Sequence, residues 1–379
     1  MTVLLCAMWT AFRRLLADKA ARATMLLSIM LYSGIYPQPY VSEVVRDVPV
    51  AVVDQDGSSA SRDLIRRIDA TDSAAVVASL PTLPDAQALF FAREVSGVVV
   101  IPPDFERELL DGNPSPIAVY GDASYFLIYS AISTAVSSAA GDLGAEVQYE
   151  RLTATGVDPG VAMAMVSPVA ISSIALFNPQ GGYASYVVPA AFVLILQQTL
   201  LMGIGVLHAG RRADRWIDAI AAPLVYILLY GLWIAVTQIL LPFAYGIERL
   251  GSWEQLYALA IPFLLAVTAL GFVMAQLAPS REAMVFTLVV MGVPLFFISG
   301  ISWPVESMPK PLWAIAALIP STTAITAFVR VDQMGSGLAA VSGTIVWQLV
   351  LTAGYTLAAL LLRARGRPLR TCPPEVRSR

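Results

Sequence analysis

The chain has 379 residues and a formal net charge of −3, and 57% of its residues are hydrophobic whereas only 13% are charged. Soluble domains carry a charge on about a quarter of their residues. This composition therefore excludes an ordinary soluble domain and indicates an integral membrane protein.

The N-terminus combines an amphipathic segment with a short apolar run. Apolar residues recur at helical spacing up to residue 22, with Phe12 beside the basic pair Arg13 and Arg14. We expect residues 1–22 to form an amphipathic interface helix on the cytoplasmic membrane surface, followed by a first transmembrane helix at 23–40. A signal peptide is the competing interpretation, but no small-residue cleavage pattern follows in YSGIYPQPY.

Residues 41–180 form a polar insert whose charge differs from that of the rest of the chain. The insert contains 18 Asp and Glu residues against 7 Arg, a net charge of −11. So acidic a segment is poorly suited to the anionic inner face of a membrane, and we expect it on the outer side.

Strand and helix patterns alternate along this insert. β-Branched runs with helical patterns between them predict a small α/β domain of about four strands, and the runs are VPVAVVD (48–54), AAVVASL (74–80), GVVVI (97–101) and PIAVYGD (116–122). A long helical pattern from Ala123 to about Ala154 leads back toward the membrane. The stretch DQDGSS (54–59) lacks the spacing of a calcium loop because Gly57 directly follows the second acid, so we expect a turn and a helix cap there and no metal site.

Five further apolar runs of about 20 residues predict five more transmembrane helices within residues 181–362. They cover residues 183–207, 219–243, 256–277, 283–301 and 338–362. No Asp, Glu, Lys, Arg or His lies in any of these runs, which disfavours proton-coupled transport. Sodium sites built from carbonyl and hydroxyl groups stay open.

A broken apolar stretch, FFISGISWPVESMPKPLWAIAALIPSTTAI, begins at Phe296. With six spans, 14 Lys and Arg of the short loops and ends lie on one side of the membrane and 3 on the other. If residues 312–328 also crossed, the basic tail at 363–379 would change sides and the ratio would fall to 9 against 8. The positive-inside rule therefore favours a re-entrant or outer helical hairpin near 303–328, with an ordinary seventh span as the alternative.

The remaining features concern the source of energy. The chain has two lysines, in LLADKA and ESMPKP, and neither belongs to a phosphate-binding loop, so we expect no ATPase and no enzyme activity in this chain. The single histidine, His208, lies at a span end, where histidine is more often interfacial than a ligand. The loop LHAGRRADRWIDAIAA (207–222) mixes charges with one aromatic and suggests a short helix that docks on a soluble motor, although the positive-inside rule alone also explains its arginines.

The whole layout resembles the permease subunits of type-2 ATP-binding-cassette (ABC) exporters. Two long motifs carry the resemblance: FNPQGGYASYVVPAAFVLILQQTLLMG (177–203) and SGISWPVESMPKPLWAIAALIPSTTAITAFVRVDQMG (299–335). Both also resemble the bacterial branch that is encoded with an ATPase, a second permease and a periplasmic adaptor of the membrane-fusion type.

The resemblance implies a dimer, with a second copy or a paralogue, above two cytoplasmic ATPase subunits that would hold the ATP and magnesium; this chain itself would hold no cofactor. It assigns ATPase contacts to the interface helix and to the loop after the second span, at Phe12, Arg13, Arg14, Arg211, Arg212, Asp214, Arg215, Trp216 and Asp218. It suggests a gating role for the hairpin residues Trp303, Pro304, Glu306 and Pro309. The plain alternative is that the prolines break a helix and Trp303 anchors at the interface.

The expected location is the bacterial inner membrane, with both termini cytoplasmic and the insert periplasmic. Scattered polar residues in apolar spans suit an amphipathic, lipid-like or drug-like substrate moved outward, although they also serve helix packing; they are Gln197, Gln198, Thr199, Gln238, Thr268 and Gln276. Membrane lipid is an expected partner and nucleic acid is not. An ion-coupled secondary transporter and a membrane-anchored receptor or scaffold with a ligand-binding outer domain stay open as other functions.

Overall fold

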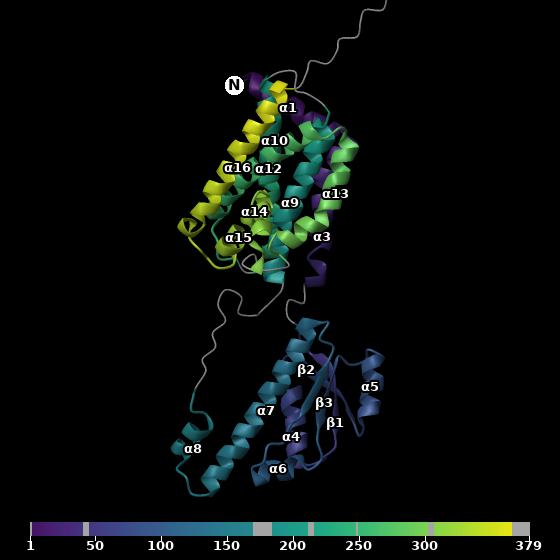
Figure 1. The fold of residues 1–379 in the computed structure, drawn as a ribbon, viewed down its shortest axis with the longest axis vertical. Coiled ribbons are helices and arrows are strands. Elements are labelled where there is room, and N and C mark those ends of the chain that lie inside the picture. Colours follow the sequence, from purple (N-terminus) through teal and green to yellow (C-terminus); the bar gives the residue numbers. More distant parts are fainter. Residues whose placement is uncertain are drawn as a thin grey trace, which may run out of the picture. The chain divides into compact units, whose positions relative to one another are not determined.

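The computed structural model describes residues 2–40, 45–169, 184–210, 216–247, 249–301 and 307–365. The chain divides into two compact units (Figure 1). The insert unit is Val44–Ile174, and the helical unit combines Met1–Glu43 with Ala175–Arg379. The boundaries of the insert unit follow the change in composition that the sequence shows at 41–180.

The insert unit is built on one four-stranded sheet. Its strands are β1 (Val48–Asp54), β2 (Ala74–Leu80), β3 (Gly97–Ile101) and β4 (Ala118–Gly121). The strand order is β2-β1-β3-β4, and β1 pairs in parallel with β2 and β3 whereas β4 runs antiparallel to β3. Its helices are α4 (Ser59–Asp69), α5 (Leu83–Phe91), α6 (Phe105–Asp111), α7 (Phe126–Ala154) and α8 (Pro159–Val166).

Strand β1 is apolar up to its last residue, Asp54, because helices cover both faces of the sheet (Figure 1). Val50 and Val52 contribute to a core shared with α4 and α7. Val53, on the other face, packs in a second core with Ala86 of α5. The alternation of side chains along a strand thus produces two cores from one short sequence.

Helix α7 belongs to the core of the insert unit, although its length and composition alone would let it cross a membrane. Its residues Ile132 and Val136 are buried with Val99 of the sheet, and its Glu146 forms an ion pair with Arg67 of α4. These contacts agree with the prediction that the helix near 123–154 is part of the insert.

The turn DQDGSS provides the helix cap that its composition predicts, and it also caps a second helix. The hydroxyl oxygen of Ser58 accepts a hydrogen bond from the amide N–H of Ser61 at the start of α4. The two carboxylate oxygens of Asp56 accept the amides of Phe105 and Glu106 at 3.0 and 3.1 Å, at the start of α6. Burial raises the pKa of Asp56, but hydrogen bonds from Ser58 and from these amides outweigh it, so the pKa lies below its ordinary value.

The helical unit consists of long helices and a broken pair. Its elements are α1 (Thr2–Ala17), α2 (Lys19–Arg22), a π-helical turn (Ala23–Leu27), α3 (Ser28–Ile35), a 3-10 turn (Gln38–Tyr40), α9 (Ala184–His208), α10 (Trp216–Ala235), a π-helical turn (Val236–Leu240), α11 (Leu241–Ala244), α12 (Trp253–Leu277), α13 (Arg281–Ile298), α14 (Lys310–Ala316), α15 (Pro320–Asp332) and α16 (Leu338–Arg365). Helix α9 is central, since 83% of its most apolar stretch is buried, against 17% for α13 and 11% for α16.

The N-terminal segment differs from the prediction of one helix over residues 1–22. The helix breaks at Asp18, which has an extended backbone and accepts the amides of Ala20 and Ala21 as the cap of α2. The predicted first span, 23–40, follows as the π-helical turn, α3 and the 3-10 turn, whereas α2 lies within the predicted interface helix. In the π-helical turn the carbonyl oxygen of Met25 accepts the indole N–H of Trp233 at 3.0 Å, which ties the segment to the end of α10.

Within the described ranges, six helices are long and apolar enough to cross a membrane. Five correspond to the predicted spans after the first, and the sixth is α7 of the insert unit. The predicted first span is divided into shorter pieces and does not meet this length criterion as a single helix. Its crossing of the membrane stays a prediction.

Helices α14 and α15 form a pair bent by 92°. The stretch that contains this pair begins and ends at one end of the helical unit, the end where α9, α12 and α16 begin. We call it the hairpin end. There the hydroxyl of Tyr186, near the start of α9, donates to the carbonyl oxygen of Gly300 at 2.7 Å. Beyond α15, the amide of Leu250, just before α12, donates to the carbonyl oxygen of Asp332 at 2.8 Å.

A buried ion pair holds the C-terminal end of α15, where the chain leaves this hairpin. The guanidinium of Arg249 lies 2.6 Å from the carboxylate of Asp332, and the two side chains are only 14% and 3% exposed. A buried ion pair is a geometric lock more than a source of stability, because removing one partner strands the other charge in an apolar environment.

Changing Asp56 to Ala should loosen the first turn of α6. Losing a capping carboxylate costs about 1 kcal/mol, so the amides of Phe105 and Glu106 should exchange with deuterium roughly fivefold faster in the intact protein. Because the folded-state pKa of Asp56 is lowered, this contribution is present at neutral pH and is lost as the pH falls through that lowered value. The control Asp111→Ala, at the exposed far end of α6, should leave both amides unchanged; equal exchange in the wild type and Asp56→Ala would refute the cap.

Changing Asp332 to Ala should destabilise the helical unit by about 3–5 kcal/mol, because it leaves the guanidinium of Arg249 buried without its carboxylate. Thermal unfolding of the purified chain in mild detergent would measure this. The double variant Arg249→Met/Asp332→Leu should melt above the single variant, since no charge is stranded. Breaking the exposed pair of Arg281 with Glu282 by Glu282→Ala is the control and should hardly change the melting temperature; a double variant no better than Asp332→Ala would contradict the lock.

Candidate functional site

Polar side chains of α9 and α16 satisfy the backbone where α14 gives way to α15. The amide of Ser321 donates to Oε1 of Gln197 at 2.8 Å, and Nε2 of Gln348 donates to the carbonyl oxygen of Pro320 at 2.7 Å. Gln348 lies ten residues into α16, or about 15 Å along its axis. The bend therefore lies near the middle of the helical unit rather than at its surface.

Two aromatic residues of α16 complete this arrangement. The indole N–H of Trp347 donates to the carbonyl oxygen of Ala317, and the hydroxyl of Tyr355 donates to that of Leu318. Irregular backbone at membrane depth is tolerated only when such partners replace the missing helical hydrogen bonds. The described part of the hairpin meets this condition.

The four predicted gating residues have different outcomes. Trp303, Pro304 and Glu306 lie outside the described residues. Pro309 is exposed and directly precedes α14 as its N-cap residue. The gating role stays a prediction for all four.

The opposite end of the helical unit, where α9 finishes and α10 begins, collects the predicted ATPase-contact residues that the structure describes. Helix α1 packs against this end through Leu15, which is buried, and Phe12, which is partly buried. Arg13 is exposed, and the guanidinium of Arg14 donates to the carbonyl oxygen of Leu207 at 2.9 Å. The interface helix is thus held against the end of α9, immediately before the loop that the sequence singled out.

Only part of that loop is described. Residues Arg211, Arg212, Asp214 and Arg215 lie outside the described ranges. Trp216 is the first residue of α10, and Asp218 is exposed in its first turn. The structure therefore brings α1 and the start of α10 to one end of the unit, as the prediction requires, without testing the contact itself.

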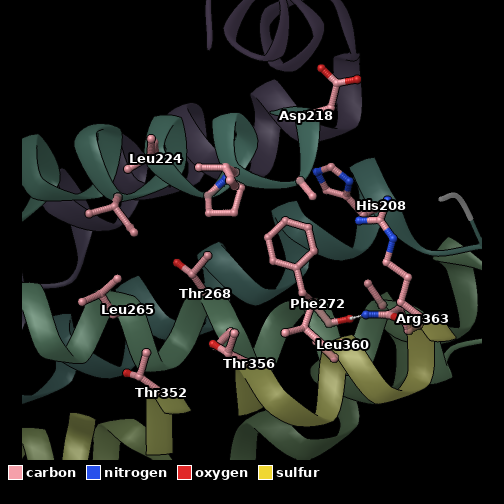
Figure 2. Close-up of a pocket in the computed structure, with 18 residues that line it drawn as sticks. His208, Asp218, Leu224, Leu265, Thr268, Phe272, Thr352, Thr356, Leu360 and Arg363 are labelled. Carbon is pink, nitrogen blue, oxygen red and sulfur yellow. Dashed lines mark hydrogen bonds between the residues drawn. The ribbon is translucent and has the colours of Figure 1, made fainter. Parts of the chain in front are cut away.

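A cavity of about 350 Å³ opens between α10, α12 and α16 near the same end (Figure 2). Small ligand sites in proteins measure about 300–1,000 Å³. Charged or ring-nitrogen side chains line one end of it, from His208 to Arg363, and apolar side chains such as Leu224 and Leu265 line the other. The carboxylate of Asp218 points away from the cavity (Figure 2).

An aromatic cluster forms one wall. The ring of His208 lies 4.9 Å from that of Phe272 between centroids, and its Nε2 is 2.7 Å from the hydroxyl of Tyr226. Among the residues that the structure describes, no group of three or more His, Cys, Asp or Glu could hold a metal ion. His208 is accordingly a wall residue with a hydroxyl partner.

The scattered polar residues noted in the sequence differ in their contacts. Thr199 bonds the carbonyl oxygen of Ile195 in its own helix, and the side-chain amide of Gln198 makes no hydrogen bond to any residue that the structure describes. Gln197 and Gln238 bond backbone groups of neighbouring elements, at Ser321 and Pro189 respectively, which is helix packing. Thr268 and Gln276 line the cavity. Sequence analysis did not identify Arg363 or Phe272 as site residues, because spacing along one helix does not reveal which residues of three helices converge.

Comparison with known proteins agrees with this architecture. A family model described as ABC-2 family transporter protein matches residues 22–361. The chain is also similar to nodulation protein J of Rhizobium leguminosarum bv. viciae, with 32% identity over 113 residues. That alignment spans 29% of this chain and 43% of the length of the relative.

The family model extends over both units, from the break before the first predicted span to the last helix. Together with the long apolar helices, it identifies a multi-pass membrane protein with a transport role. The chain belongs to the ABC-2 family of transporter proteins.

Proposed function

We propose that this chain is the permease subunit of an ATP-driven exporter that moves an amphipathic, lipid-like or drug-like substrate out of the cytoplasm or the inner leaflet. The observation that carries the proposal is the family match over residues 22–361. Within this proposal the energy comes from a separate cytoplasmic ABC ATPase, which holds ATP and magnesium, because the chain has no phosphate-binding loop of its own.

Charge supports the orientation. The bacterial inner membrane would hold the chain with both termini in the cytoplasm, so that 14 Lys and Arg of the loops and ends face inward. The insert at residues 41–180, with its net charge of −11, then lies in the periplasm. A periplasmic adaptor of the membrane-fusion type is the partner we propose for it.

The end where α9 finishes then faces the cytoplasm and is the proposed docking surface for the ATPase. The anchoring of Arg14 to Leu207 supports this, because it fixes α1 against the end of α9, shortly before residues 211–218 in the sequence. Phe12, Arg13, Asp218 and the loop arginines would contact the motor.

The hairpin is the proposed outer gate of the pathway. Its bend is held deep in the unit by Gln197 and Gln348, whereas its start and finish lie at the hairpin end. A short segment with this support could shift as one piece when its neighbours move. Trp303, Pro304, Glu306 and Pro309 precede α14 in the sequence and would shape the opening.

A second permease, identical or paralogous, completes the proposed assembly. Helix α13 supports it with a broad exposed apolar face, on which Phe286 is 71% and Val293 66% exposed. Faces of this kind in membrane proteins meet either lipid or another helix. Two permeases would enclose the proposed pathway between them.

Purification of the tagged chain in mild detergent from its native host should recover a soluble ATPase in equal amount, and nucleotide hydrolysis by the complex would identify it. The triple variant Arg211→Ala/Arg212→Ala/Arg215→Ala should release that ATPase. A matched loss of charge on the insert unit, Arg66→Ala/Arg93→Ala/Arg107→Ala, should leave it bound. Recovery of the chain without any ATPase, under conditions that preserve known complexes, would refute the exporter.

Cysteine labelling tests the orientation and the hairpin together. In a chain whose Cys6 and Cys372 are changed to Ser, single cysteines at Ser307 and Ser336 flank α14 and α15. An impermeant maleimide added to intact spheroplasts should modify both, because a re-entrant hairpin leaves both outside. A seventh span would protect Ser336→Cys instead. The control is a separate chain in which only Cys372 is changed to Ser: its native Cys6, which is exposed, should react only after the membrane is permeabilised.

A further inference from the structure

The cavity between α10, α12 and α16 has the dimensions of one half of a bilayer. Its lining on α12 runs from Leu265 to Gln276, a rise of eleven residue steps or about 16 Å. The hydrocarbon core of a membrane is about 30 Å thick, so this length corresponds to a single leaflet. Helix α16, which forms one wall, is the least buried of the long helices of the helical unit, so the cavity lies toward the periphery of the unit.

The polarity of the lining changes along this axis. Arg363, near the end of α16, and His208, the last residue of α9, lie at one end of the cavity (Figure 2). Leu224, Ile227 and Leu265 line the remainder with apolar surface. Arginine is permanently charged and presents several N–H donors in a fork that matches a carboxylate or a phosphate.

A buried hydroxyl lies between the two ends. Thr268 is 3% exposed, points into the cavity, and its Oγ1 makes no hydrogen bond to any residue that the structure describes. Most helical threonines bond their own backbone, as Thr352 of the same lining does with Gln348. A buried polar atom without a partner is costly, and a ligand that brings a carbonyl or hydroxyl group to this depth would remove that cost.

We propose that this cavity binds an anionic amphiphile. The carboxylate or phosphate lies at Arg363 and His208, an oxygen next to the headgroup meets the hydroxyl of Thr268, and the apolar chain lies along Leu224, Ile227 and Leu265. The claim that the cavity binds such a molecule rests on the cavity alone. The claim that the bound molecule is the exported substrate rests on the proposed function. A bilayer phospholipid and a free single-chain amphiphile share this chemistry.

The test uses the full chain, without ATPase or nucleotide, in nanodiscs of neutral phosphatidylcholine. The probe is palmitate carrying a photoactivatable diazirine, and mass spectrometry maps the cross-linked residues. The carboxylate should label the linings of α10, α12 and α16, whereas the corresponding long-chain alcohol should label them about tenfold less, because it lacks the charge that Arg363 binds. Equal labelling by the two probes would overturn the anionic headgroup.

Variants separate the three contacts. Arg363→Gln should lower labelling about tenfold while Arg363→Lys keeps most of it, and Thr268→Val should lower it about threefold. Ala359→Phe on the exposed helix α16, and separately Ala269→Phe on α12, should block the cavity and abolish labelling. Arg330→Gln at the hairpin end and Thr287→Val on α13 are the matched controls. Gel filtration and melting temperature show that each variant is folded, and unchanged labelling in Arg363→Gln and in both Phe variants would overturn the site.

A last competition experiment distinguishes a bilayer phospholipid from a free single-chain amphiphile as the ligand. Nanodiscs containing anionic phosphatidylglycerol should compete with the probe if a bilayer phospholipid occupies the cavity. Competition by added free fatty acid, with no effect of phosphatidylglycerol, assigns the cavity to single-chain amphiphiles; both results support an anionic amphiphile, and competition by neither overturns it. Because no ATPase is present, loss of labelling leaves the exporter proposal standing, and failure to recover an ATPase leaves the binding result standing.

Discussion

The helical unit depends on how the chain satisfies its backbone where α14 gives way to α15. Two short helices meeting at 92° leave carbonyl and amide groups without helical partners, and in an apolar environment each such group costs free energy. Gln197, Gln348, Trp347 and Tyr355 supply the missing hydrogen bonds from two other helices. The positions of α9 and α16 are therefore coupled to the hairpin, since neither can move far without breaking the bonds at the bend.

This coupling relates the hairpin to the cavity. Helix α16 supplies the side chains that hold the bend and, further along, Thr352, Thr356 and Arg363 of the cavity lining. A displacement of α16 would change both regions at once. In the proposed exporter such a displacement would start at the cytoplasmic end, where α1 is anchored to α9, so that one helix could connect the motor end, the cavity and the proposed outer gate.

The two units obey different rules of stability. The insert unit packs two apolar cores against a sheet and closes its turns with carboxylate and hydroxyl caps, which is the construction of a soluble domain. The helical unit buries several polar side chains against broken backbone, as at Gln197 and Gln348. Its charged pair, Arg249 with Asp332, locks two segments rather than contributing net stability. The contrast in charge between the two parts of the sequence reflects this difference.

Local pattern was sufficient to predict much of the fold. The strands at 48–54, 74–80 and 97–101, the Ser58 cap in DQDGSS and five of the long apolar helices follow from periodicity and from short-range hydrogen bonding, which depend on neighbours in sequence. The bonds from Asp56 to Phe105 and Glu106 span about 50 residues and do not. The break at Asp18 was missed because apolar spacing continues across it while one carboxylate ends the helix.

Tertiary structure alone decided the contacts between distant residues: Arg14 with Leu207, Gln197 with Ser321, Arg249 with Asp332, and the meeting of His208, Thr268 and Arg363 in one cavity. The physical reason is that a helix repeats its own faces every few residues but does not specify which face of another helix it meets. The sequence by itself therefore determined a polar insert and a set of apolar helices, and only the packing of those helices produced the cavity and the supported bend.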